Sequence, residues 1–308
     1  MSVLFSFPGQ GAQQTGMLQA LQQHPLTRLV LEEAGDALHE DVLQLDSEHA
    51  LADTRAVQLC LLIAGVASAR RLLEGLPRLS AYTAGLSIGA YAAAVTSGAL
   101  AFADALQLVS LRGRLMQEAY PSGYTMAAVQ GLTIAEVEAL LAPYRQQGLP
   151  LYLANINADN QHALAGTTGL LEEVEKKVRE TGNGRVTRIR ISVPSHCELL
   201  NEQAGQLMEA FENVVLQQPV MRYLSGSSAR LLTTVERIRD DLAFNMCRIV
   251  NWQGVMESAF ERGVRLHVQL APGSVLTNLG RRAIPEAINI SYQENSLETL
   301  QKLVLTQQ

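Results

Sequence analysis

The apolar positions of residues 3–119 predict strands and helices in alternation. An apolar run at residues 3–7 ends at the loop Pro8-Gly9-Gln10-Gly11, and a second apolar run covers residues 79–84. Apolar spacing predicts helices over residues 27–38, 54–73, 90–97 and 102–119. We therefore expect an α/β domain with a parallel sheet, whose functional site lies in the loops that follow the strands.

The pattern changes between residues 123 and 193. Four short apolar or alternating runs, 126–130, 151–155, 162–165 and 186–193, predict strands, and helices are predicted over 133–145 and 170–179. The order strand, helix, strand, strand, helix, strand predicts a ferredoxin-like (βαββαβ) small subdomain at 123–193. We expect it to be inserted into a large domain formed by residues 1–122 and 194–308, because helices, a strand at 266–270 and a final helix follow it.

Composition narrows the class of protein. Of the 308 residues 47% are apolar and 18% charged, and the net charge is −6 without a basic run, so we expect no nucleic-acid partner. Three scattered cysteines are too few for a disulfide framework or a zinc site, and suit a reducing cytoplasm. The N-terminus lacks the features of a signal peptide, and the apolar stretch 59–69 is too short to span a membrane. We expect a cytoplasmic protein with no metal and no membrane partner.

The pentapeptide Gly85-Leu86-Ser87-Ile88-Gly89 fits a nucleophile elbow. It lies between the predicted strand 79–84 and the predicted helix 90–97, which is the context that this motif has in α/β-hydrolase-like sheets. Such a turn exposes the Ser87 hydroxyl at the end of the strand and points the following N–H groups at the same place. The large domain is therefore expected to be α/β-hydrolase-like, with Ser87 as its candidate nucleophile.

A serine nucleophile needs a base, and His196 is the histidine placed best for that role. It follows Val193-Pro194-Ser195, where the predicted small subdomain returns to the large domain. A structural role stays open on position alone. The nearby Glu198 is badly placed to orient the ring, so we expect a carbonyl group to accept from Nδ1–H, which would make the site a Ser–His dyad. The other five histidines fall in polar surface sequence or inside predicted strands, where a surface or core role is expected: His24, His39, His49, His162 and His267.

The loop 8–11 and the arginines of the helix 102–119 can each be interpreted as functional or as purely structural. The loop 8–11 is either a simple turn after a strand or the source of N–H groups that complete an oxyanion hole with the amide after Ser87. Arg112 and Arg114 point to different sides of the predicted helix 102–119. Both could be solvated, but an arginine that points inward near Ser87 would bind a carboxylate on the acyl group.

Five motifs, in order along almost the whole chain, resemble the malonyl-CoA:acyl-carrier-protein transacylase family. They are Phe7-Pro8-Gly9-Gln10-Gly11, Gly85-Leu86-Ser87-Ile88-Gly89-Ala90-Tyr91, Arg112-Gly113-Arg114-Leu115-Met116-Gln117, Val193-Pro194-Ser195-His196-Cys197 and Ala271-Pro272-Gly273-Ser274-Val275-Leu276. The resemblance implies that Ser87 accepts the acyl group and that His196 is the base. It also implies that the N–H groups of Gln10 and Ile88 form the oxyanion hole.

The same resemblance assigns two more residues and the partners. It implies that Arg112 pairs with the malonyl carboxylate, and that Asn245 stands where the family usually has a glutamine whose carbonyl orients the histidine. The implied reaction is ping-pong transfer from malonyl-CoA to the thiol of an acyl carrier protein, on its phosphopantetheine-type arm. No tightly bound cofactor is implied.

Two departures from the family pattern separate its branches. The usual elbow reads Gly-His-Ser-Leu-Gly-Glu-Tyr, whereas Leu86 and Ala90 replace the histidine and the glutamate here. This form resembles the malonate decarboxylase epsilon subunit, which implies that the partner is that complex's carrier subunit. The alternatives are an ordinary transacylase of fatty-acid or polyketide synthesis, a serine esterase or thioesterase, and a non-catalytic scaffold subunit.

Overall fold

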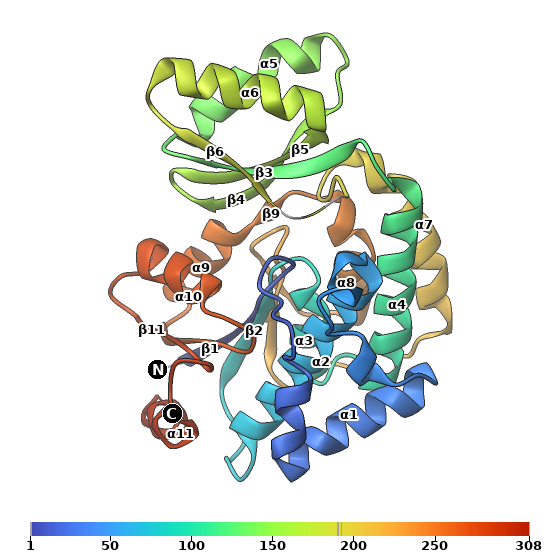
Figure 1. Ribbon diagram of the computed structural model, residues 1–308. Helices are drawn as coiled ribbons and strands as arrows, with labels where there is room; N and C mark the ends of the chain where they lie inside the picture. The colour runs from blue at the N-terminus through green and yellow to red at the C-terminus, as the bar shows by residue number, and fades with distance from the viewer. Residues whose placement is uncertain (1, 190, 192, 308) are drawn as a thin grey trace.

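The larger of two sheets organises the fold. The computed structural model describes residues 2–189, 191 and 193–307. The six strands of this sheet are, in spatial order, β11 (Ile288–Ser291), β10 (Val264–Gln269), β1 (Ser2–Phe7), β2 (Ala81–Gly85), β7 (Arg222–Leu224) and β8 (Leu231–Leu232). All neighbours are parallel except β7 and β8. Strands β1 and β2 lie side by side at the centre of this sheet (Figure 1). The loops that follow β1 and β2 therefore meet at one edge of the sheet.

Helices cover both faces of this sheet, which explains why β1 is buried from Val3 to Phe7. Phe5 packs on the side of α1 (Pro25–Leu38), α2 (Thr54–Leu73), α3 (Gly89–Thr96), α4 (Phe102–Ala119), α7 (Asn201–Ala210), α8 (Val235–Phe244) and α11 (Leu297–Thr306). Leu4 packs on the opposite side, against α9 (Trp252–Glu261) and α10 (Val275–Ala283). The α/β architecture expected from the sequence is confirmed.

Helix α2 is the core helix of the larger layer. It is long and apolar enough to cross a bilayer, but 83% of its apolar window is buried inside the protein. Gly65 brings this helix against the elbow helix and β1, because a Cβ there would lie 3.0 Å from the Ala92 Cβ and 3.1 Å from Phe7. The apolar run is therefore explained by packing.

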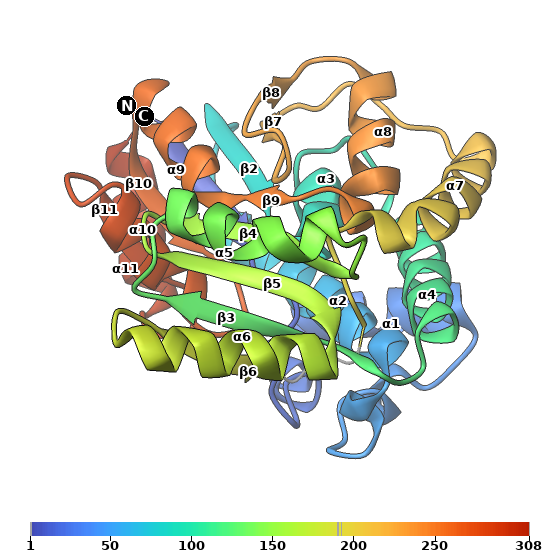
Figure 2. The same cartoon turned by 90° about the horizontal axis from the view of Figure 1, so that it is seen from above.

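The second sheet lies above the first in Figure 1. Its strands are, in order, β6 (Arg185–Ile189), β3 (Tyr124–Gln130), β5 (Gln161–Thr167), β4 (Leu151–Ala158) and β9 (Val250–Asn251). Helices α5 (Ile134–Gln146) and α6 (Thr168–Thr181) cover its outer face, as the view from above shows (Figure 2). The elements from β3 to β6 follow the predicted strand and helix order. The strand predicted at 186–193 ends at Ile189 here, and residues 190 and 192 lie outside the described residues.

Strand β9 adds a feature that the sequence did not indicate. It comes from residues outside 123–193 and pairs in parallel with β4, Asn155 with Val250 and Ile156 with Asn251. We propose that 123–193 is the small subdomain and that 1–122 and 194–308 form the large domain. On this division β9 is a strand of the large domain that extends the small sheet and joins the two parts.

A buried polar network supports the centre of the large sheet. The His267 ring bonds to Ser6 Oγ through Nε2 at 2.7 Å and to Asn289 Oδ1 through Nδ1 at 2.8 Å. Asn289 Nδ2 donates to the carbonyls of Ile284 and Ala287, so Oδ1 faces the ring and Nδ1 carries the proton. These are residue types of a catalytic triad, but Ser6 and His267 are fully buried. The expected core role of His267 is confirmed.

Burial lowers the pKa of His267 to about 4, against 6.5 in its ordinary state. Unfolded chains bind this proton below about pH 6.5 and the folded protein only below about pH 4, so stability is lost as the pH falls between these values. We expect about 3 kcal/mol of unfolding free energy to depend on His267 in this range. Urea denaturation at pH 7 and pH 4.5 should show a smaller loss in His267→Gln, and an equal loss would refute this role.

Candidate active site

The backbone of the elbow holds Ser87 in a left-handed conformation. Its φ is +56°, between the end of β2 and the first turn of α3. A Cβ on Gly85 would lie 2.0 Å from the carbonyl carbon of Gly89, and one on Gly89 would lie 2.1 Å from Phe7 O. Only glycine fits at both positions, so the motif is a packing requirement that presents the serine.

The loop after β1 lies directly against the elbow. A Cβ on Gly9 would lie 2.7 Å from Leu86 Cδ2 and 2.8 Å from Leu86 O, which shows how closely the two backbones approach. Within the described part of the chain, the N–H groups of Gln10 and Ile88 donate to no protein acceptor. Free N–H donors in the loops beside a serine hydroxyl are the groups from which an oxyanion hole is built.

His196 is held by backbone carbonyls. Its Nδ1 lies 2.8 Å from the Asn245 carbonyl oxygen and 3.2 Å from that of Arg248, while its own N–H donates to Met246 O at 2.7 Å. Two carbonyl acceptors place the proton on Nδ1, which leaves Nε2 as an acceptor. The family resemblance implied one carbonyl at Asn245, and the structure places a second, that of Arg248, beside the same nitrogen. The φ of His196 is +66°, so this residue is also in the left-handed region.

Burial, and next to it the charge of Arg112, lower the pKa of His196 to about 4. The ring is therefore neutral near pH 7. A neutral imidazole is the form that can accept a proton from a hydroxyl.

Arg112 is fully buried and lies beside Ser87. Its Nη2 donates to Ser87 Oγ at 3.3 Å and to Asn245 Oδ1 at 3.1 Å, and its Nη1 donates to Gln58 Oε1 at 2.7 Å. Burial lowers the pKa of Arg112 to about 10, so it stays charged at neutral pH. Arg114 is exposed, as expected for the arginine on the other side of α4.

Sequence reasoning missed Gln58. This side chain is fully buried in α2, where it accepts from Arg112 and its Nε2 lies 3.4 Å from both Gln10 Oε1 and Met116 Sδ. One feature of the sequence could have indicated it: the Gln58 amide lies between Val57 and Leu59 in an otherwise apolar helix. A polar side chain buried there needs a hydrogen-bond partner.

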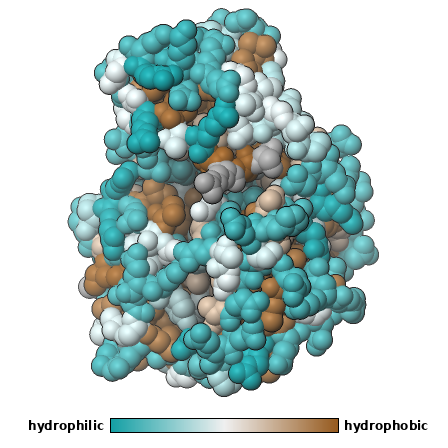
Figure 3. All heavy atoms as spheres, viewed as in Figure 1, coloured by the Kyte–Doolittle hydropathy of each residue, from teal (hydrophilic) through white to brown (hydrophobic). Residues whose placement is uncertain are grey.

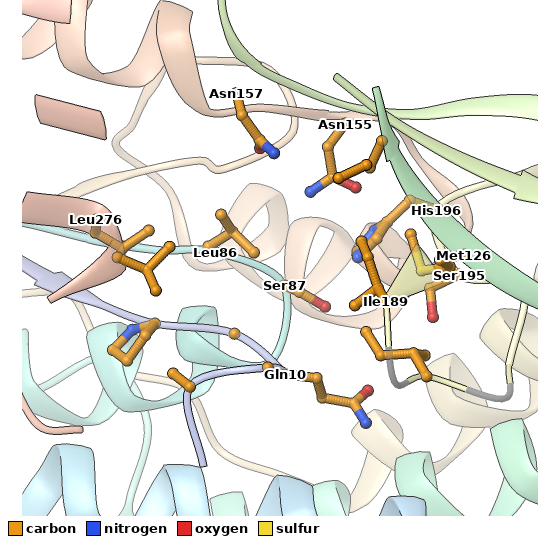
Figure 4. A pocket seen from close by; sticks show the side chains of 18 of the residues that line it. Gln10, Leu86, Ser87, Met126, Asn155, Asn157, Ile189, Ser195, His196 and Leu276 are labelled. Atoms are coloured by element: carbon orange, nitrogen blue, oxygen red, sulfur yellow. The ribbon is translucent and has the colours of Figure 1, made fainter. Parts of the chain in front are cut away.

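Ser87 and His196 open onto one cavity of about 210 Å³ between the two sheets. In Figure 4 the Ser87 hydroxyl lies between the Gln10 loop and the His196 ring, with Asn155 and Asn157 above. Much of the remaining lining is apolar: Leu86, Met126, Ile189, Ile191, Val275 and Leu276. The space-filling view shows brown, apolar surface at the hollow between the upper and lower parts (Figure 3). Such a lining keeps bulk water away from a reacting serine.

The described residues thus combine a nucleophile, a neutral base, two unpaired N–H donors and a buried cation. This set can form and stabilise an acyl-serine. No group of three or more His, Cys, Asp or Glu side chains within residues 2–189, 191 and 193–307 is arranged to hold a metal.

The model of the acyl transferase domain family matches residues 4–302. This chain belongs to that family. It is 34% identical over 296 residues to the malonyl CoA-acyl carrier protein transacylase of Haemophilus influenzae, covering 94% of each chain. It is 32% identical over 285 residues to the Escherichia coli protein of the same name, with 91% of this chain and 92% of that protein covered.

Solved structures agree with this family membership. The crystal structure of FabD from Acinetobacter baumannii superposes with a TM-score of 0.91 at 32% identity, covering 99% of this chain and 98% of that one. A second solved structure is described as a type II PKS acyl-carrier protein in complex with its malonyl-transacylase. A chain of this complex superposes with a TM-score of 0.87 at 31% identity, with 94% of each chain covered. The protein is an acyltransferase.

Leu86 and Ala90, the two elbow residues that differ from the usual family pattern, have different surroundings. Leu86 lines the cavity and packs against Gly9. Ala90 is buried in the large apolar cluster. Of the two, only Leu86 can touch a bound acyl group.

The depressed pKa of His196 predicts an unusual pH profile. We expect the rate of acylation by p-nitrophenyl acetate to be flat near neutral pH and to fall only as the pH drops through about 4, because the imidazole is neutral above that value. Arg112→Gln removes the nearby positive charge, so the fall should move to higher pH. A wild-type fall near pH 6.5, or an unmoved one in the variant, would contradict this account of the base. Circular dichroism at each pH controls for unfolding.

Proposed function

We propose that the protein transfers a malonyl group from malonyl-CoA to the thiol of an acyl carrier protein, through a malonyl ester on Ser87. The observation that carries this proposal is the fully buried guanidinium of Arg112, 3.3 Å from Ser87 Oγ. It forms no ion pair with any acidic side chain of the described residues. A buried cation beside the nucleophile suits an acyl group that ends in a carboxylate.

In the first half-reaction Ser87 attacks the thioester carbonyl. Neutral His196 takes the hydroxyl proton at Nε2, while the carbonyls of Asn245 and Arg248 hold Nδ1–H. The N–H groups of Gln10 and Ile88 bind the oxyanion. Collapse of the tetrahedral intermediate breaks the C–S bond, and His196 returns the proton to the departing CoA thiolate.

The second half-reaction runs the same steps in reverse with a new thiol. The carrier's phosphopantetheine-type thiol enters the cavity, loses its proton to His196 and attacks the ester. Ser87 regains its proton as the malonyl thioester leaves. The apolar cavity lining supports transfer over hydrolysis, because it limits the water that can reach the ester.

The relatives and the carrier complex described above are named transacylases, which supports general malonyl-CoA:carrier transfer, in fatty-acid or polyketide synthesis, more than service to a decarboxylase. The malonate decarboxylase interpretation rests only on Leu86 and Ala90 and stays a prediction. We further propose that the enzyme acts in the cytoplasm.

Ser87→Ala tests the covalent step. The wild-type protein should gain the mass of one malonyl group when mixed with malonyl-CoA, and lose it when an acyl carrier protein is added. Ser87→Ala should gain none and lose turnover by a factor on the order of a million. The exposed Ser47→Ala is the matched control and should behave like the wild type.

Intact-protein mass spectrometry distinguishes the rivals. A stable malonyl label on Ser87→Ala would refute the nucleophile. Rapid release of free malonate without a carrier would favour a hydrolase, and no label on the wild type would favour a scaffold. A chase with the malonate decarboxylase carrier beside a fatty-acid carrier separates the two branches.

A further inference from the structure

Within the described residues, one buried donor of Arg112 and one of its neighbour Asn245 have no hydrogen-bond partner. Arg112 Nε and Asn245 Nδ2 are both shielded from solvent and unpaired among the described residues. They belong to side chains that are bonded to each other, through Asn245 Oδ1 and Arg112 Nη2. An unpaired buried donor costs about 1–3 kcal/mol, so each of these two N–H groups would gain from a ligand that accepts hydrogen bonds.

The orientation of the Asn245 amide is fixed by chemistry. Arg112 has only donors, so the amide must turn its oxygen toward the guanidinium. Its NH₂ group cannot donate to Arg112, which has no acceptor, and has no partner among the described residues. Asn245 is 3% exposed, so bulk water does not satisfy this amide.

Asn245 also contacts both the candidate base, His196, and the buried cation, Arg112. Its backbone carbonyl accepts from His196 Nδ1, while its side-chain carbonyl accepts from Arg112 Nη2. A side-chain substitution keeps the first bond and removes the second. The two roles can therefore be separated by experiment.

We propose that the Asn245 side chain determines acyl-group specificity: its Oδ1 positions Arg112, and its Nδ2 donates to the carboxylate of the acyl group. This inference rests on the proposed malonyl transfer and adds a second carboxylate donor to Arg112. The ligand class is a short acyl chain that ends in a carboxylate. Acetyl groups, which lack the carboxylate, gain nothing from this donor.

Acylation of Ser87 frees the guanidinium for this contact. In the free enzyme one N–H of Arg112 Nη2 donates to the Ser87 hydroxyl. Once Oγ becomes an ester oxygen it is a poor acceptor, so Nη2 can turn to the carboxylate, which only one methylene group separates from the ester carbonyl. Arg112 Nε and Asn245 Nδ2 then supply the remaining donors.

The test compares loading of Ser87 from malonyl-CoA and from acetyl-CoA, by rapid-quench mass spectrometry. Asn245→Leu keeps the size and the backbone carbonyl but removes both side-chain hydrogen bonds. Malonyl loading should fall roughly 10- to 100-fold, the usual effect of a hydrogen bond to a charged group, while acetyl loading changes by less than about threefold. Asn245→Asp should fall further with malonyl, because its charge repels the carboxylate and pairs with Arg112.

Two controls keep the outcomes distinct. The exposed Asn213→Leu should leave both rates unchanged. The pH at which acetyl loading falls should be the same in Asn245→Leu as in the wild type, because His196 keeps its carbonyl. If Asn245→Leu does not fold, the ratio of malonyl to acetyl loading in Asn245→Asp tests the proposal instead.

Equal losses for malonyl and acetyl groups, or an unchanged preference, would overturn the role of Asn245. A wild type that loads no malonyl group would instead overturn the proposed function.

Discussion

The buried positive charge of Arg112 is the constraint on which the site depends. A guanidinium without solvent is costly unless its N–H groups are hydrogen-bonded, and here the amide of Gln58, the hydroxyl of Ser87 and the amide of Asn245 accept from its two Nη groups. These partners come from α2, the elbow and the end of α8. One charge therefore fixes three elements around the nucleophile and helps to keep His196 neutral.

Backbone geometry supplies the second constraint. Ser87 and His196 both have positive φ, at the two positions where side chains must point into the cavity. Strain of this kind persists only where the surroundings enforce it. Close packing of Phe7 on Gly89 enforces it at the elbow, and bonds to Met246 and Asn245 enforce it at the histidine. Backbone contacts with neighbouring segments thus hold both strained residues in place.

Much of the fold could be predicted from the sequence, because helices and strands depend on local patterns. The candidate site residues came from the elbow motif and from the family resemblance, and their roles stay predictions. Helices α2 and α4 begin and end where apolar spacing placed them. Strand β9 could not be predicted, since its two residues pair only through a distant partner. Gln58 and the side-chain role of Asn245 were missed for the same reason: their partner, Arg112, is 54 and 133 residues away along the chain.

A crystal structure of the protein after reaction with malonyl-CoA tests the central claim most directly. The account predicts a malonyl ester on Ser87 Oγ, with its carboxylate within hydrogen-bond distance of Arg112 and of Asn245 Nδ2. The ester carbonyl oxygen should face the N–H groups of Gln10 and Ile88. A carboxylate that points into the open cavity, away from Arg112, would contradict the account.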